Sequence, residues 1–217
     1  MISLFLDIET LPGDESVKAQ IEADIKHPPQ MTKPETIEKW EMEQKPSEIE
    51  KKYRDTSLRG HTGRILCVGY IKEGPHGTTE GVLRGDEPAI LKEFWELAAD
   101  VDLFVGFNVL EFDLKYIWQR SVVHRVSPSR RLDFARYRGG EVYDVMQEWE
   151  KWGRDHISLD ALSRALGIPS PKDKMHGSEV YDYYLAGRLQ DICDYCLGDV
   201  RATREIYNRM NFLAEGT

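Results

Sequence analysis

Two carboxylates stand two residues apart near the start of the chain, directly after an apolar run. Residues 2–6 indicate a strand buried on both faces, and we expect this strand to end where Asp7 and Glu9 begin. Because residues two apart in a strand point to the same side, both carboxylates should project together from the carboxyl edge of a sheet. Two like charges repel each other, and a pair of hard oxygen ligands suits Mg²⁺ or Mn²⁺. Two solvated acids are the competing interpretation, so the choice depends on whether distant carboxylates reach the same place.

Two later segments offer acids that could reach this edge. Asp113 falls in the first turn of an expected helix, where the positive end of the helix dipole favours a carboxylate. In the last expected helix, Tyr195 and Asp199 are four residues apart and therefore lie on one face. Together with Asp7 and Glu9, these residues give four acids and one tyrosine a possible common meeting point.

The apolar patterns elsewhere predict an α/β fold, with a mixed central sheet flanked by helices. A charged helical excursion, broken by prolines, follows the first strand at about 14–60, and we expect one domain over residues 1–217. Asp144 and Ser158 are well placed as helix N-caps. Further strands are expected at 65–71, 78–84, 103–107 and 141–143, and helices at 88–99, from about 112, at 144–152, 158–166, 179–185 and 189–212.

Composition limits the protein class and its partners. The chain has 217 residues, of which 41% are hydrophobic, so it can bury one substantial core. It has no apolar run of about 18 residues and no basic leader, so we expect a cytoplasmic protein that does not associate with membranes. The net charge of −9 argues against holding nucleic acid by bulk electrostatics. A phosphate substrate remains compatible with an acidic site when divalent ions bridge the two.

Two other groups of residues have simpler interpretations. Cys193 and Cys196 form a C-x-x-C pair inside a helical pattern, and only Cys67 remains elsewhere, so core packing is favoured over a zinc site. Five arginines between Arg125 and Arg138 form a basic cluster in an acidic chain, which fits either a surface loop or a phosphate contact.

Taken in order, three motifs resemble the DEDD superfamily of 3′–5′ exonucleases, which has a ribonuclease H-like fold. The motifs are the first strand through Asp7-Ile8-Glu9-Thr10, then Gly106-Phe107-Asn108 with Asp113, then Tyr195 with Asp199. The tyrosine four residues before the last acid resembles the tyrosine subclass, whereas the histidine subclass would need histidine where Asp194 stands. The greatest similarity is to stand-alone predicted exonucleases related to family-B polymerases, and it spans nearly the whole chain.

This resemblance implies hydrolysis of a phosphodiester with two Mg²⁺ or Mn²⁺ ions. Asp7, Glu9 and Asp199 would bind one ion that carries the attacking water, and Asp7 with Asp113 would bind a second ion at the leaving oxygen. Tyr195 would orient the water, because a phenol is a poor base at neutral pH. The expected substrate is a single-stranded 3′ end, contacted by Ile8, Thr10, Leu11, Phe107, Asn108, Phe112 and Lys174, although core burial is the simpler role for both phenylalanines.

Two other functions are compatible with the same residues. An acid pair after a first strand also occurs in phosphatases that use an aspartate nucleophile, but Glu9 stands where that class needs Asp. A catalytically inert module of the same fold could bind nucleic acid or a partner. The sequence does not distinguish DNA from RNA, and we expect no fused polymerase and leave the oligomeric state open.

Overall fold

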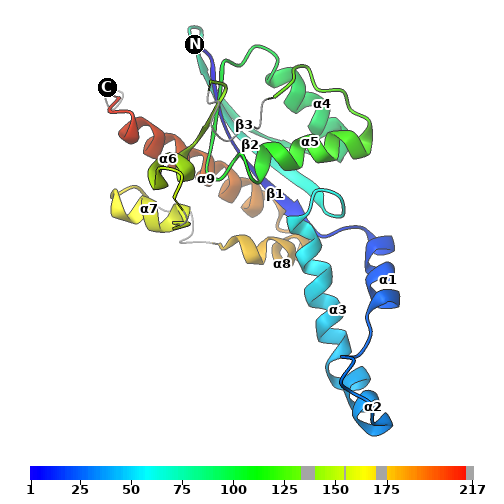
Figure 1. The fold of residues 1–217 in the computed structure, drawn as a ribbon. Helices are drawn as coiled ribbons and strands as arrows, with labels where there is room; N and C mark the ends of the chain where they lie inside the picture. Colours follow the sequence, from blue (N-terminus) through cyan, green and yellow to red (C-terminus); the bar gives the residue numbers. More distant parts are fainter. Residues whose placement is uncertain (133–139, 154, 170–174, 214–217) are drawn as a thin grey trace. The chain divides into compact units, whose positions relative to one another are not determined.

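The computed structural model describes residues 1–132, 140–153, 155–169 and 175–213. The chain divides into two compact units, of which one contains residues 1–9 and 65–217 and the other contains residues 10–64. Figure 1 shows the elements of both units. Lys174, Arg136 and Arg138 lie outside the described residues, so the structure does not address their expected roles.

A five-stranded sheet forms the centre of the larger unit. The strands are β1 (Ser3–Leu11), β2 (Arg64–Gly74), β3 (Gly77–Arg84), β4 (Leu103–Gly106) and β5 (Val142–Asp144), in the spatial order β3-β2-β1-β4-β5. β4 runs parallel to both β1 and β5, whereas β2 and β3 form an antiparallel hairpin. The sheet is therefore mixed, and the predicted α/β class is confirmed.

The two faces of the sheet have separate cores. Leu4, Leu6 and Ile8 of β1 pack with helices α4 (Glu87–Leu97) and α5 (Asp113–His124), whereas Phe5 packs with α9 (Leu189–Met210). Figure 1 shows α4 and α5 together on one side of the sheet. Because side chains alternate along a strand, Asp7 and Glu9 share the side of Phe5, which is the face that α9 covers.

Three shorter helices also belong to this unit. α6 (Val145–Glu150) and α7 (Leu159–Ala165) pack against α9, and so does α8 (Val180–Leu185), which follows a 3₁₀ turn at Gly177–Glu179. The two predicted N-caps are confirmed, because Asp144 accepts hydrogen bonds from the first turn of α6 and Ser158 from that of α7.

A buried ion pair fixes α5 against α4. The Arg120 guanidinium donates to both carboxylate oxygens of Glu87, over 2.8 and 2.7 Å, and the Ile65 backbone N–H donates to the same carboxylate over 2.7 Å. Such a bidentate pair fixes geometry as well as contributing energy. The contact therefore holds the helix whose first residue is Asp113.

The smaller unit is mostly helical. It contains α1 (Glu15–Asp24), α2 (Pro34–Glu43), α3 (Lys45–Arg54) and a 3₁₀ turn at Asp55–Leu58. Prolines occupy the start of α2 and of α3, where a missing N–H costs no hydrogen bond. Trp40 is buried, and the Tyr53 hydroxyl donates to the Gly13 carbonyl over 2.9 Å.

β1 is longer than the sequence indicated. It continues to Leu11, so Asp7 and Glu9 lie within the strand and not at its end. An acid does not end this strand, because Ile8 and Leu11 supply further buried apolar residues beyond Asp7, one on each face. Within β1, the residues that pair with β4 are Ser3, Leu4 and Phe5, so the two acids lie beyond the end of this neighbouring strand.

None of the helices within the described ranges is both long and apolar enough to cross a membrane.

Candidate active site

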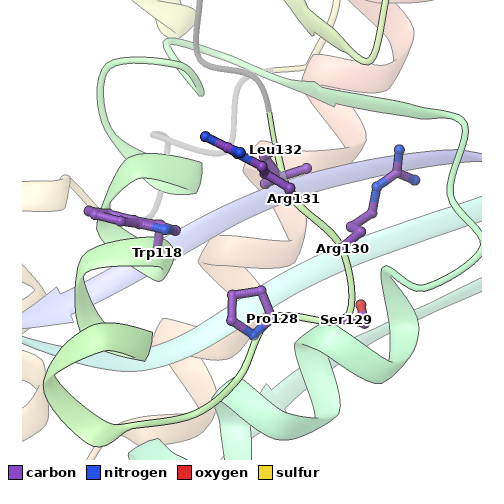
Figure 2. A pocket seen from close by; sticks show the side chains of 6 residues that line it. All are labelled: Trp118, Pro128, Ser129, Arg130, Arg131 and Leu132. Carbon is purple, nitrogen blue, oxygen red and sulfur yellow. The ribbon is translucent and has the colours of Figure 1, made fainter.

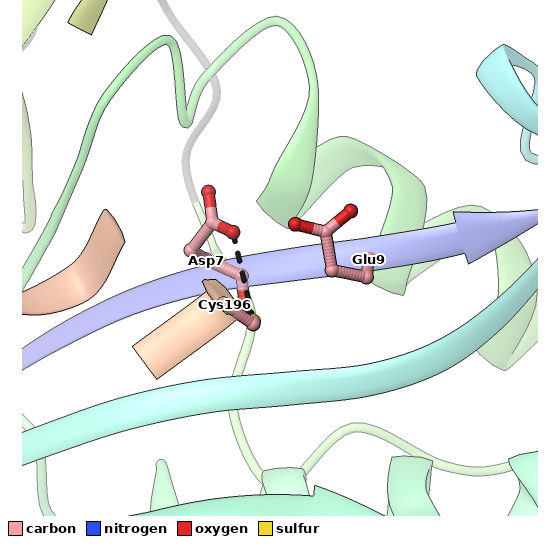
Figure 3. A group of neighbouring side chains, drawn as sticks. All are labelled: Asp7, Glu9 and Cys196. Carbon is pink, nitrogen blue, oxygen red and sulfur yellow. Dashed lines mark hydrogen bonds between the residues drawn. The ribbon is translucent and has the colours of Figure 1, made fainter. Parts of the chain in front are cut away.

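Asp7 and Glu9 project from the same side of β1, as the strand alternation requires. Figure 3 shows their carboxylates turned toward each other, with Cys196 of α9 approaching Asp7. One donor atom from each of these three residues lies within 4.8 Å of the other two. Asp7 is partly exposed, whereas Glu9 is only 8% exposed and makes no hydrogen bond or ion pair within the described residues. Both acids therefore line one buried polar site.

Asp113 joins these two acids from α5. It is the first residue of that helix and is buried, and its Oδ1 accepts a hydrogen bond of 2.9 Å from the Ile8 backbone N–H. Ile8 stands between Asp7 and Glu9, so this bond brings the Asp113 carboxylate to the segment that carries both. Residues 105 positions apart in the sequence are thus in direct contact.

Tyr195 and Asp199 reach the site from α9. Both side chains are buried, at 7% exposure each, and, besides the effect of burial, the Asp199 carboxylate lies close enough to the Tyr195 phenol to raise the pKa of that phenol. The 3₁₀ turn before α8 lies beside them, since a Cβ atom added to Gly177 would stand 3.9 Å from the Tyr195 hydroxyl. The five residues singled out from the sequence for catalysis therefore converge from one strand and two helices.

The electrostatics of the acids follow from their crowding. Burial raises the pKa of Asp7 well above its ordinary value, and the charges of Asp113, Asp199 and Glu9 raise it further. The pKa of Glu9 is raised by burial and then by Asp199 and Asp113. Burial also raises the pKa of Asp113 to about 8, although hydrogen bonds from its own N–H and that of Ile8 oppose the shift.

These carboxylates fit the ligand set of a divalent cation. They are hard oxygen donors, they repel one another, and Asp7, Glu9 and Asp113 form no ion pair in the described part of the chain. Bound positive charge would reverse the destabilisation that their mutual repulsion causes. Among the described residues, these three carboxylates therefore lack a compensating positive charge, which a bound cation would supply.

Asp144, which the sequence predicts only as a helix cap, also positions the site. The carboxylate of Asp144 accepts hydrogen bonds from the backbone N–H groups of Asn108 over 3.0 Å and Leu110 over 3.1 Å, besides capping α6. Asn108 is in the left-handed region, with φ of 58°, at the sharp turn that connects β4 to α5. Asp144 thus holds the turn that leads into Asp113. Its place directly after a short expected strand was a usable sequence signal.

Replacing Asp144 by alanine is expected to destabilise the protein and to lower any activity of the site. The change leaves four backbone N–H groups without their acceptor, which should cost about 1–3 kcal/mol of unfolding free energy or more. Urea denaturation of Asp144→Ala and Asp144→Asn measures this effect. The asparagine variant should recover part of the loss, because its amide oxygen still accepts, and equal stability of wild type and Asp144→Ala would contradict the assignment.

The residues expected to contact substrate have mixed environments. Phe107 packs against the core on the α9 face, and Phe112 packs against the other core, with its ring 5.5 Å from that of Tyr116. Both are partly exposed, as is Asn108, whereas Ile8 is buried. Within the smaller unit, Leu11 is buried and Thr10 is partly exposed.

Part of the basic cluster lines a separate pocket along α5 and the segment after it. The pocket has a volume of about 580 Å³ and is lined by Trp118, Pro128, Ser129, Arg130, Arg131 and Leu132. Arg130 has a structural role, since it forms an ion pair of 3.0 Å with Glu141 and lies over the Phe104 ring. In Figure 2, Arg131 extends toward the Trp118 side of the pocket and Arg130 away from it.

The fold is that of a polymerase exonuclease domain of the ribonuclease H-like class. A solved structure of the family B DNA polymerase from the hyperthermophilic archaeon Pyrobaculum calidifontis superposes with a TM-score of 0.64 at 15% sequence identity. The match covers 97% of this chain but 24% of the polymerase chain, so the protein spans about a quarter of that enzyme's length. At this identity the likeness establishes the fold alone.

The family is established by sequence. A family model described as a predicted 3′–5′ exonuclease related to the exonuclease domain of PolB matches residues 64–216, and the chain belongs to this family. The matched span contains Asp113, Tyr195 and Asp199, whereas Asp7 and Glu9 precede it. No curated protein sequence matches the chain. Membership supports a nuclease function.

Proposed function

We propose that the protein is a metal-dependent 3′–5′ exonuclease of the tyrosine subclass, which releases nucleoside monophosphates from a nucleic-acid 3′ end. The observation that carries the proposal is the convergence of Asp7 and Glu9 from β1, Asp113 from α5, and Asp199 with Tyr195 from α9. Burial and the neighbouring charges raise the pKa values of Asp7, Glu9 and Asp113, so this group of acids is costly to fold, and such an arrangement is typical of functional sites.

The carboxylates would hold two divalent cations, Mg²⁺ or Mn²⁺. Asp7, Glu9 and Asp199 would hold one of them, and Asp7 together with Asp113 would hold the other. When bound, this pair supplies Lewis-acid stabilisation of the attacking and leaving oxygens of the phosphodiester. The protein's own contribution is rigidity, because the bond from Ile8 to Asp113 and the ion pair of Arg120 fix the ligands before substrate arrives.

Tyr195 acts as a hydrogen-bond donor and not as a base. Burial raises the pKa of its phenol, and the charges of Asp199, Glu9 and Asp7 raise it further, so the hydroxyl keeps its proton at neutral pH. A protonated phenol beside Asp199 can orient the attacking water without removing its proton. The role is therefore one of positioning.

Tyr195→Phe is expected to lower kcat by about tenfold to a hundredfold, below the loss typical of a removed general base, with little change in KM. The variant keeps the ring that packs in the site and removes only the hydroxyl. Steady-state rates on a single-stranded oligonucleotide measure the split between kcat and KM. Tyr183→Phe, at a partly exposed phenol on α8, is the matched control, and an unchanged kcat in Tyr195→Phe would contradict the positioning role.

The proposed substrate is a single strand of DNA, with RNA as the alternative that the same chemistry would accept. The aromatic rings of Phe107 and Phe112 are partly exposed, which is compatible with stacking on a base, and Asn108 stands at the same turn. Ile8, Thr10, Leu11 and Lys174 remain further predicted contacts.

A time course on matched DNA and RNA oligonucleotides tests the proposed function. With a 5′ label and Mg²⁺ or Mn²⁺, the label should pass through a ladder of products shortened from the 3′ end, and a 3′ label should appear at once as mononucleotide. Both results should disappear in EDTA. An absence of shortening with either metal, or shortening that persists undiminished in EDTA, would contradict the proposal. Failure to bind either metal in calorimetry would instead favour an inert binding module.

A further inference from the structure

A thiol stands among the carboxylates of the candidate site. Sγ of Cys196 lies 3.5 Å from the backbone oxygen of Asp7 and 3.6 Å from its Oδ2, and it is buried on the face of α9 that covers β1. Figure 3 shows this contact between the two side chains. A thiol contributes nothing to binding Mg²⁺, which prefers hard oxygen ligands, but a thiolate is a strong ligand for softer cations.

The position of Glu9 is a second, independent observation. The residue is more than nine-tenths buried, and its carboxylate has no hydrogen bond or ion pair within the described ranges and is turned toward Asp7. A buried carboxylate in this state lacks a compensating partner. A cation placed between Asp7, Glu9 and Cys196 would supply one.

The distances suit a small tetrahedral cation. With Zn–S bonds of about 2.3 Å and Zn–O bonds of about 2.1 Å, tetrahedral donors lie about 3.6 Å apart. The contact between the Cys196 sulfur and Asp7 Oδ2 is already 3.6 Å, and no separation among the three donor atoms exceeds 4.8 Å. Small side-chain rotations would therefore bring all three donor atoms within bonding distance of one cation, without movement of β1 or α9.

We propose that Asp7, Glu9 and Cys196 form a binding site for a thiophilic divalent cation, such as Zn²⁺ or Cd²⁺, and that this cation inhibits the enzyme. On binding, the Cys196 thiol releases its proton to solvent and the sulfur forms a bond to the cation. The net charge of the site therefore rises by one unit, two from the cation less one for the released proton. The inhibition rests on the proposed function, because it arises when the soft cation occupies the carboxylates that Mg²⁺ or Mn²⁺ requires. The binding itself does not depend on that function.

Cadmium provides a direct spectroscopic test. Titration of the metal-free wild-type protein with Cd²⁺ should produce the ultraviolet charge-transfer absorption of a sulfur–cadmium bond. The band should be lost in Cys196→Ser and also in Asp7→Asn, which retains all three thiols. It should persist in Cys193→Ser, the matched control, because that buried thiol lies on the same helix outside the donor group. Circular dichroism of each variant checks that it is folded.

Inhibition gives the second measurement. The concentration of Zn²⁺ that halves the Mg²⁺-dependent rate should rise at least about tenfold in Cys196→Ser, measured against that variant's own uninhibited rate, as is typical for loss of a group that supports metal binding. A cadmium band that survives in Cys196→Ser or in Asp7→Asn would overturn the proposal. If the wild-type protein shows the cadmium band but has no exonuclease activity, only the proposed function is contradicted. If it is active but shows no cadmium band, only the proposed site for thiophilic cations is contradicted.

Discussion

Replacing Asp7 by asparagine should abolish metal-dependent hydrolysis and, in the same protein, stabilise the metal-free fold. Asp7 is shared by both proposed cation positions, so its loss removes a ligand from each, and a fall in rate of at least about 10³-fold is expected. The stabilisation arises because burial and three neighbouring acids raise the pKa of Asp7, so its ionised form is destabilised in the folded state. Activity and stability should therefore change in opposite directions.

The measurement pairs an exonuclease time course with urea denaturation at pH 8 in EDTA. Asp194→Asn is the matched control, since Asp194 is exposed on α9 and binds Gln190 away from the site. It should leave both the rate and the urea midpoint close to those of wild type. Undiminished trimming by Asp7→Asn would contradict the catalytic role of Asp7. A urea midpoint lower than that of wild type would contradict the electrostatic account of the site.

The metal-free protein should also lose stability as the pH rises from about 5 to 8. The pKa of Asp113 is about 8 in the folded state against an ordinary value of 3.8, so between these values the folded protein holds a proton that the unfolded chain has released. The unfolding free energy must then fall as the pH rises, and the stabilisation present below the unfolded pKa is lost through about pH 8. A shift of this size corresponds to several kcal/mol, on the order of 1.4 kcal/mol per pKa unit.

Acids elsewhere give the opposite slope at lower pH. The pKa of Glu87 is lowered overall, because its hydrogen bonds with Arg120 and Ile65 outweigh the effect of burial. The contribution of Glu87 to the unfolding free energy is present above its pKa in the unfolded chain, and it is lost as the pH falls through its pKa in the folded protein. Stability in EDTA should therefore be greatest near pH 5, between these two regimes.

Urea denaturation in EDTA across this pH range measures how the unfolding free energy depends on pH. A second series with Mn²⁺ measures how far the cation removes that dependence. A cation that binds only the folded state stabilises it in proportion to the logarithm of its concentration, and it does so most where the acids are ionised. Asp113→Asn should flatten the slope without metal. Stability that rises steadily from pH 5 to pH 8 in EDTA would show that the acids are not crowded as described.

Local sequence patterns were sufficient for the parts of the site that depend on neighbouring residues. The strand alternation predicted that Asp7 and Glu9 share a side, the helical period predicted that Tyr195 and Asp199 share a face, and capping preference predicted the N-cap role of Ser158. Each of these depends on positions no more than four residues apart. The family resemblance then supplied which of these local pairs belong together.

Contacts between distant segments were not predictable in this way. Whether Cys196 or another residue of α9 faces Asp7 depends on how the helix is rotated and shifted against the sheet, which no local pattern determines. The second function of Asp144, at the turn that carries Asn108, depends equally on pairing between β4 and β5. The end of β1 differs from the prediction for a related reason, because an acid inside a strand is tolerated only where a particular tertiary site receives it.

The central place of β1 in the sheet determines when this protein can finish folding. Ser3 pairs with Leu103 and Asp7 meets the thiol of Cys196, so β1 cannot complete its contacts until the later segments β4 and α9 have been synthesised. Until then Leu4, Phe5 and Leu6 have no completed core to enter, and nascent chains should depend on chaperones that shield apolar segments. A chain interrupted before α9 lacks Asp199 as well as the cover of one sheet face, so unfinished copies should be both inactive and readily degraded.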